Sequence, residues 1–253
     1  MKSLTINNRY GEKLAAYLFT PQEEPRYIMV VCHGFRGGKE NGGKIFTFAE
    51  KLKKLGLGVM AFDFSGSGQS EGDFLNASLS RQAEDLRQVI DHLDAEFSVP
   101  IILLGRSFGG STVLAGGSGD QRIAGYVLWS TPINLEQTFA GMLPDKYSQL
   151  KCGEIITIRD EAGEFGLHPD LIRDFSLHDM DSYLQQMGPR PVLVVHATDD
   201  EVVEPGNALY MQERLEKCSL TMVDGAGHRF LDKITHREDI TLEWLINTFD
   251  LEA

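Results

Sequence analysis

The stretch Ile101-Ile102-Leu103-Leu104-Gly105-Arg106-Ser107-Phe108-Gly109-Gly110 decides the fold. Four apolar residues lead directly into a G-x-S-x-G pattern, and a helical pattern continues to Ala115. A serine at a sharp turn from strand to helix, flanked by small residues that prevent clashes, is the geometry of a nucleophile elbow. The stretch therefore predicts a buried strand, a reactive serine at position 107 and a helix whose first N–H groups face that serine.

A second match to the same pattern, Gly68-Gln69-Ser70-Glu71-Gly72, lacks this context. The preceding glycines already turn the chain away from its strand, and no helical pattern begins after it. We therefore interpret Ser70 as a loop serine. The glycines at 66, 68 and 72 also miss the G-x-G-x-x-G spacing by one position, so we expect no dinucleotide and no other cofactor.

Short β-like runs alternate with helical patterns along most of the chain. Expected strands cover residues 4–7, 14–19, 27–31, 58–62, 101–104, 125–129, 192–195 and 220–223. Expected helices cover residues 44–55, 79–93, 107–115, 206–215 and 236–249, with Ser78 or Ser80 as the N-cap of the second. Continuously apolar strands are typical of a sheet buried on both faces. The pattern predicts an α/β fold with a mostly parallel central sheet, helices on both faces and an antiparallel pairing of the first two strands.

The alternation breaks between Thr131-Pro132 and Gly188-Pro189. We expect residues 1–131 and 188–253 to form the core and residues 132–187 to form an inserted cap with a short β-pair near Ile155 to Ile158. The large apolar residues of this insertion are interpreted as cap core rather than substrate contacts: Phe139, Met142, Leu143, Tyr147, Phe165, Leu171 and Phe175. Arg159 and Arg173 are interpreted as solvated surface.

A serine hydroxyl is too weakly acidic to attack unaided, so a base must accept its proton and a carboxylate must orient the base. His33, His196 and His228 each follow an expected strand, at the sheet edge where ligands bind. We select His228 as the base, because the flexible turn 224–227 places it over the serine. Asp200 is the preferred orienting acid, with Asp199 as the alternative. His33, His196, His228 and Asp200 lack the fixed spacing of a metal site, so we expect no metal.

The order Ser107, Asp200, His228 along the chain resembles that of the α/β-hydrolase superfamily. The resemblance also rests on His33-Gly34-Phe35, on the turn from Phe62 to Ser70 and on Gly225-Ala226-Gly227-His228. It extends over nearly the whole chain and implies an α/β-hydrolase fold. Within the superfamily, the sequence is similar to cinnamoyl and feruloyl esterases and related small carboxylesterases. It departs from that pattern at Arg106, where His is frequent, and at Ala197, where Gly is usual.

The resemblance places the oxyanion hole at the backbone N–H groups of Phe35 and Phe108. The residue patterns agree, because Phe108 follows the nucleophile at a helix start and Phe35 lies in the turn after a neighbouring strand. We expect a serine carboxylesterase that acts on small to medium, possibly aromatic, esters without a cofactor. Three alternatives stay open: a peptidase, thioesterase or perhydrolase reaction on the same residues, a non-catalytic ligand-binding protein, and a metal-dependent hydrolase.

Composition limits the partners. The 253 residues carry 24 Lys and Arg against 37 Asp and Glu, a net charge of −13, which disfavours nucleic acids and anionic membrane surfaces. The longest apolar runs, about six residues, fall far short of the roughly 18 that span a bilayer. Three cysteines without a C-x-x-C pair, and a polar N-terminal stretch, favour a cytoplasmic protein with a small-molecule substrate. The oligomeric state stays open.

Overall fold

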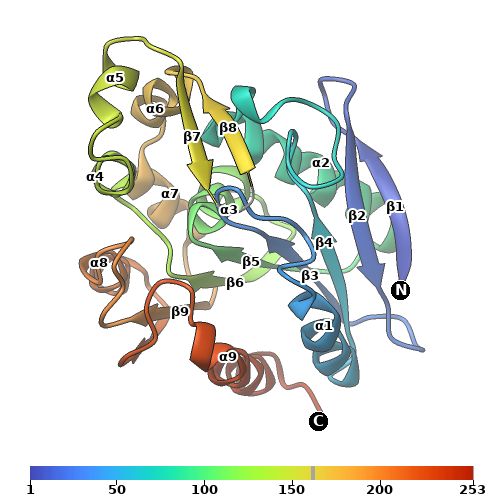
Figure 1. The fold of residues 1–253 in the computed structure, drawn as a ribbon. Coiled ribbons are helices and arrows are strands. Elements are labelled where there is room, and N and C mark those ends of the chain that lie inside the picture. The colour runs from blue at the N-terminus through green and yellow to red at the C-terminus, as the bar shows by residue number, and fades with distance from the viewer. Residues whose placement is uncertain (161–162, 253) are drawn as a thin grey trace.

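A central sheet of eight strands organises the computed structural model, which describes residues 1–160 and 163–252 (Figure 1). The strand order is β1-β2-β4-β3-β5-β6-β9-β10. The pairs β1–β2 and β2–β4 are antiparallel and all other pairs are parallel. The strands of this sheet are β1 (Lys2–Asn7), β2 (Lys13–Phe19), β3 (Tyr27–Cys32), β4 (Leu57–Phe62), β5 (Ile101–Arg106), β6 (Ile123–Trp129), β9 (Val192–Ala197) and β10 (Cys218–Val223). The predicted, mostly parallel sheet with an antiparallel first pair is confirmed.

Helices cover both faces of the sheet (Figure 1). Alternate residues of each central strand point to opposite faces, so Leu103 packs with α2 and α3 while Leu104 packs with α1 and α9. The α-helices are α1 (Lys44–Lys54), α2 (Leu79–Phe97), α3 (Phe108–Gly117), α4 (Leu135–Met142), α5 (Tyr147–Lys151), α6 (Asp170–Asp174), α7 (Met180–Met187), α8 (Gly206–Arg214) and α9 (Ile234–Phe249). Single 3-10 turns occupy Phe74–Asn76, Phe175–Leu177 and Leu231–Lys233. Ser78 caps α2 by accepting a hydrogen bond from the Arg81 N–H at 3.2 Å.

Residues between β6 and β9 lie above the carboxyl edge of the sheet (Figure 1). They contain α4 to α7 and a separate antiparallel hairpin, β7 (Ile156–Asp160) and β8 (Gly163–Leu167). Phe139 and Phe175 pack against Phe108 of the core, with ring centroids 5.4 and 6.2 Å away. The buried apolar residues of this segment therefore continue the core on the α2 and α3 side of the sheet.

The turn from β5 into α3 is packed too closely for any side chain at its glycines. A Cβ at Gly105 would lie 2.5 Å from the Gly109 carbonyl oxygen, and one at Gly109 would lie 2.4 Å from the carbonyl oxygens of Cys32 and His33. These neighbours are backbone atoms that cannot move aside. The two glycines of the G-x-S-x-G pattern thus allow α3 to start directly against the ends of β5 and β3.

We predict that Gly105→Ala lowers the free energy of unfolding by about 1–3 kcal/mol, the usual cost of overpacking. The matched control is Gly141→Ala in α4, where an added Cβ meets no atom within 4 Å. There the substitution is expected to be neutral or to stabilise the helix by up to about 1 kcal/mol. Urea denaturation of both variants tests the expectation, and equal effects at the two sites would contradict it.

Candidate active site

Ser107 occupies the turn between β5 and α3 in a strained backbone conformation, with φ 53° and ψ −128°. Positive φ is costly for a residue with a Cβ, and such strain persists only where the surrounding packing imposes it. The Ser107 N–H donates to the Trp129 carbonyl oxygen at 2.8 Å, which holds the turn against β6. The conformation presents the Ser107 hydroxyl above the carboxyl edge of the sheet.

His228 and Asp200 join Ser107 in a continuous chain of hydrogen bonds. The Ser107 Oγ lies 3.0 Å from His228 Nε2, and His228 Nδ1 lies 2.9 Å from Asp200 Oδ2. An ionised carboxylate can only accept, so Nδ1 carries the proton and Nε2 is free to accept one from the serine. The structure thus brings together three side chains that are 28 and 121 residues apart in the sequence.

Asp200 is buried and strongly held. Burial raises the pKa of its carboxyl, but hydrogen bonds from His196 and His228 and from the Val203 N–H outweigh burial and hold the pKa below its ordinary value. The His196 Nε2 lies 3.3 Å from Oδ2, and the Val203 N–H donates to Oδ1 at 2.8 Å. Asp200 is therefore ionised and fixed in orientation beside the imidazole.

The alternative acid, Asp199, lies elsewhere. Its Oδ1 accepts from the backbone N–H groups of Ala226 and Gly227, at 2.9 and 3.2 Å, rather than from the imidazole. Glu201 accepts from the His228 N–H at 2.9 Å. Three consecutive acids thus bind one loop: the middle one holds the His228 side chain and the outer two hold its backbone. Sequence reasoning missed the roles of Asp199 and Glu201, although an acidic run opposite a Gly-rich turn could have suggested them.

The backbone of the turn after β3 lies against Ser107. A Cβ at Gly34 would lie 3.2 Å from the Ser107 Cβ, which is a tight contact that glycine avoids. Within the described residues, neither the Phe35 N–H nor the Phe108 N–H donates to a protein acceptor. Two unpaired N–H groups next to a serine hydroxyl could receive a negatively charged oxygen. The Phe35 ring itself packs with Phe74, Phe108, Phe139 and Phe165.

The remaining candidates have structural partners. His33 accepts from the Phe64 N–H at 3.2 Å through Nε2, its Nδ1 lies 2.8 Å from the Gly34 carbonyl oxygen, and burial lowers its pKa. Ser70 bridges two backbone groups, donating to the Asp63 carbonyl oxygen at 2.6 Å and accepting from the Ala15 N–H. Ser70 is thus a loop serine. In the described part of the chain, no three His, Cys, Asp or Glu side chains are grouped as metal ligands would be.

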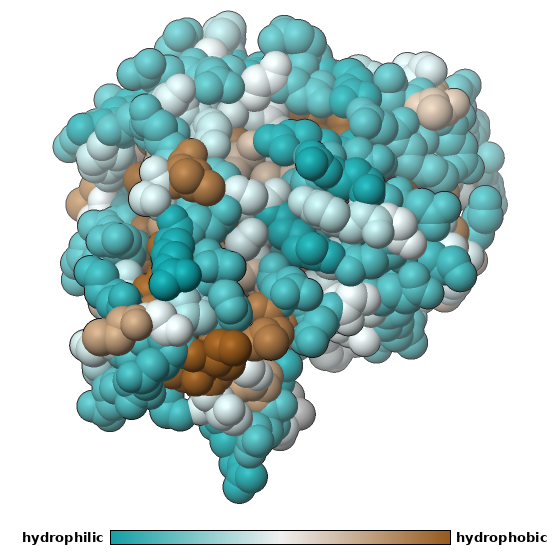
Figure 2. Space-filling view, turned by 90° about the horizontal axis from the view of Figure 1, so that it is seen from above, coloured by the Kyte–Doolittle hydropathy of each residue, from teal (hydrophilic) through white to brown (hydrophobic). Residues whose placement is uncertain are grey.

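The described helices include none long and apolar enough to cross a membrane. Figure 2, which looks down on the molecule from above, shows a mostly hydrophilic face on which apolar residues form separate patches rather than one continuous surface. Large exposed apolar side chains are correspondingly few: Met1, Tyr10, Phe46, Met142, Ile155, Leu177, Leu209 and Leu231.

The low pKa of Asp200 makes stability depend on pH. Because the folded-state pKa lies below the unfolded value of 3.8, ionised Asp200 stabilises the fold above that value, and its contribution is lost as pH falls through the folded-state pKa. We expect Asp200→Asn to lower the free energy of unfolding by about 1.5–3 kcal/mol at neutral pH. Denaturant titrations should show this difference shrinking below about pH 4. A difference that stays constant into acid would contradict the assignment.

Comparison with known proteins agrees with the fold. The ferulic acid complex of Est1E from Butyrivibrio proteoclasticus matches with a TM-score of 0.81 at 22% identity, covering 98% of this chain and 99% of that one. The rat monoglyceride lipase is 32% identical over 126 residues, which are 49% of this chain and 41% of the lipase. The human mitochondrial palmitoyl-protein thioesterase is 24% identical over 219 residues, which are 83% of this chain and 68% of the thioesterase. This chain thus spans about two fifths of the length of the monoglyceride lipase.

The family model described as serine aminopeptidase, S33, matches residues 23–152, slightly more than half of the chain. The matched range includes the loop after β3 and the elbow at Ser107, and the sheet order and helix layers are those of an α/β hydrolase. The predicted α/β-hydrolase fold is confirmed, and the chain belongs to the serine aminopeptidase S33 family of α/β hydrolases.

Proposed function

We propose that this chain is a serine hydrolase that cleaves carboxylic esters of small to medium size through Ser107, His228 and Asp200. The observation that carries the proposal is the unbroken hydrogen-bond chain from the Ser107 hydroxyl through His228 to Asp200, with distances of 3.0 and 2.9 Å. Such a chain activates a hydroxyl that is otherwise a weak nucleophile. The names of the esterase and lipase relatives support an ester substrate.

The reaction follows from the positions of the hydrogen-bonding groups. Ser107 Oγ bonds to the acyl carbon while His228 Nε2 accepts the hydroxyl proton, and Asp200 stabilises the resulting imidazolium. The carbonyl oxygen becomes an oxyanion that the Phe35 and Phe108 N–H groups bind. His228 returns the proton to the leaving alcohol as the ester bond breaks. Water, deprotonated by the same imidazole, then attacks the acyl-enzyme and releases the carboxylic acid and Ser107.

Residues 132–187 are proposed to act as a cap over this site. Met142 at the end of α4 lines the cavity that contains Ser107 and His228, and more than a third of its surface is exposed. Phe139, Leu171 and Phe175 are buried in the core instead. Met142 therefore differs from its apolar neighbours in the insertion and is a candidate substrate contact.

We further propose a cytoplasmic setting and a small-molecule partner. The three cysteines are free thiols, which supports a reducing compartment such as the cytoplasm. The acidic net charge supports a small molecule rather than a nucleic acid as the partner.

The nucleophile is testable by covalent labelling. A fluorophosphonate probe is expected to label the wild-type chain at Ser107 and to leave Ser107→Ala unlabelled, because the alanine has no hydroxyl to attack phosphorus. Ser70→Ala, the matched change at the loop serine, is expected to label as the wild type does. Mass spectrometry of the labelled peptide identifies the site. Labelling of the wild type anywhere other than Ser107, or none at all, would refute the proposal.

The two neighbouring aspartates provide a second test. Asp200→Asn is expected to lower kcat by about 10⁴-fold, since the amide no longer selects the productive tautomer of His228. Asp199→Asn removes the charge but keeps an oxygen that can accept from the Ala226 and Gly227 N–H groups, so it is expected to cost less than about tenfold. Steady-state kinetics on para-nitrophenyl esters compares the two. Equal losses in the two variants would contradict the assignment of Asp200, and not Asp199, as the acid that orients His228.

Matched ester, thioester and amide substrates distinguish the reaction types. A thioesterase or peptidase reaction stays an alternative because the family description and the thioesterase relative name them. Substantially faster cleavage of the thioester or the amide than of the ester would replace the proposed substrate class while keeping the same residues.

A further inference from the structure

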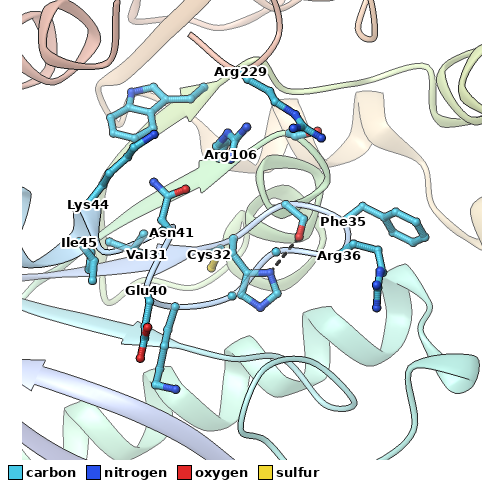
Figure 3. Close-up of a pocket in the computed structure, with 18 of the residues that line it drawn as sticks. Val31, Cys32, Phe35, Arg36, Glu40, Asn41, Lys44, Ile45, Arg106 and Arg229 are labelled. Atoms are coloured by element: carbon cyan, nitrogen blue, oxygen red, sulfur yellow. Dashed lines mark hydrogen bonds between the residues drawn. The ribbon is translucent and has the colours of Figure 1, made fainter. Parts of the chain in front are cut away.

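The cavity that contains Ser107 and His228 extends to the face of the sheet covered by α1 and α9. It has a volume of about 970 Å³. This extension is called the arginine chamber here, and it is lined by Arg106, Arg229 and Arg237 together with apolar residues: Val31, Leu104, Ile45, Phe48, Trp129 and Ile234. In Figure 3, Arg106 and Arg229 lie close together on one side, Asn41 and Lys44 come from the other, and Phe35 points away from them.

Arg237 of α9 is a buried cation in the wall of the arginine chamber. The residue is only 2% exposed, and within the described residues its Nε and Nη1 atoms have no hydrogen-bond partner. The guanidinium lies 4.1 Å from the Trp129 ring centre and 4.9 Å from that of Phe230. These aromatic contacts orient the cation. They leave the Nε and Nη1 donors unpaired, because N–H groups point along the plane of the guanidinium and not toward a ring above it.

Arg106, the last residue of β5, also has a guanidinium nitrogen that makes no hydrogen bond in the described part of the chain. This nitrogen, Nε, is shielded from solvent. Burial and the neighbouring Arg229 lower the pKa of Arg106, and burial and Arg106 lower that of Arg237 to about 9. Asp200 acts in the opposite direction on the pKa of Arg106, and Glu238 does so on that of Arg237, but burial and the neighbouring cation outweigh both acids.

The acids nearest to the chamber are engaged with other groups. Glu238 lies 3.0 Å from Lys51, Glu40 accepts from the Tyr17 hydroxyl, and Asp200 is held by His196 and His228. In the described residues, neither Arg106 nor Arg237 has an ion pair with an acid. The buried Arg237 and the partly buried Arg106 both retain unpaired donors in the cavity that contains Ser107, and together they form a preorganised site for an anion.

We propose that the arginine chamber binds an oxyanion at the far end of the substrate, so that the hydrolysed ester carries a carboxylate or phosphate separated from the scissile carbonyl by a short apolar chain. This proposal rests on the proposed function. The guanidinium edges match the oxygens of either group, and the apolar walls fit the intervening methylenes. Overall the chain is acidic, so its long-range field repels anions and the selectivity must come from these local contacts.

The test compares substrates that differ only in the terminal charge. The set is the mono-para-nitrophenyl ester of glutarate, its methyl-masked diester, and the para-nitrophenyl ester of γ-phosphonobutyrate. The wild type should cleave one of the charged esters with higher kcat/KM than the masked ester, and the preferred anion identifies the natural group. Arg106→Met and Arg237→Met should each lower this ratio by about 10- to 100-fold, the range for a charge-assisted hydrogen bond.

Arg173→Met is the matched control, because Arg173 lies exposed on α6 and pairs with Asp170 at 3.1 Å. It should leave the charged-to-masked ratio as in the wild type. Thermal unfolding separates binding from a structural role. An isolated buried cation is costly, so Arg237→Met should keep or raise Tm. A lower Tm with an unchanged ratio would make Arg237 structural and overturn the proposal.

A binding measurement does not depend on turnover. Trp129 stacks on Arg237, so glutarate should change its fluorescence while dimethyl glutarate should not; Trp244→Phe as the background removes the only other tryptophan. The change should disappear in Arg237→Met. If no ester is cleaved but this arginine-dependent binding occurs, the proposed function fails and the anion site stands. Equal kcat/KM for charged and masked esters, with no fluorescence response, would refute the anion site.

Discussion

The close approach of backbone to backbone at the turn from β5 into α3 is the constraint on which the site depends. Gly105 and Gly109 let the helix start against β5 and β3, and this packing holds Ser107 at a positive φ that a free chain would avoid. The same packing brings Gly34 within contact distance of the serine and thereby sets the position of the Phe35 N–H. The strain at one residue is thus imposed by three strands and a helix, and it aligns the hydroxyl with groups from distant loops.

Electrostatics then divides the site into two halves. On one side, Asp199, Asp200 and Glu201 hold the His228 loop, so negative charge is fully engaged by N–H donors and the imidazole. On the other side, Arg106 and Arg237 retain donors that no protein group satisfies. The first half is complete without a ligand, because every carboxylate has its partners. The second half has unpaired donors, and such donors are expected in a binding site but not in a structural ion pair.

Local sequence patterns predicted the fold correctly, and they selected three residues that the structure places within hydrogen-bond distance of one another. The apolar run before Gly105 predicts a strand, and small residues after Ser107 predict the elbow, because both depend on neighbours in sequence. Local patterns favour neither Asp199 nor Asp200 strongly, because the packing of their shared loop decides which of these adjacent residues contacts the imidazole. Arg237 could not be found at all. Its position in a polar helical segment indicates a solvated face, whereas Trp129 and Phe230 bury it through contacts across 108 and 7 residues of sequence.

A buried guanidinium without an acid partner requires an explanation in terms of free energy. Its desolvation is only partly repaid by stacking on Trp129, and an apolar side chain of similar volume would fill the space at lower cost. Residues that lower the stability of the fold are expected at binding and catalytic sites. Arg106 adds to this cost, because repulsion from a second cation lowers the pKa of Arg237 further than burial alone. An incoming oxyanion would remove both penalties at once, so the arginine chamber is preorganised for negative charge in the cavity that contains the Ser107 hydroxyl.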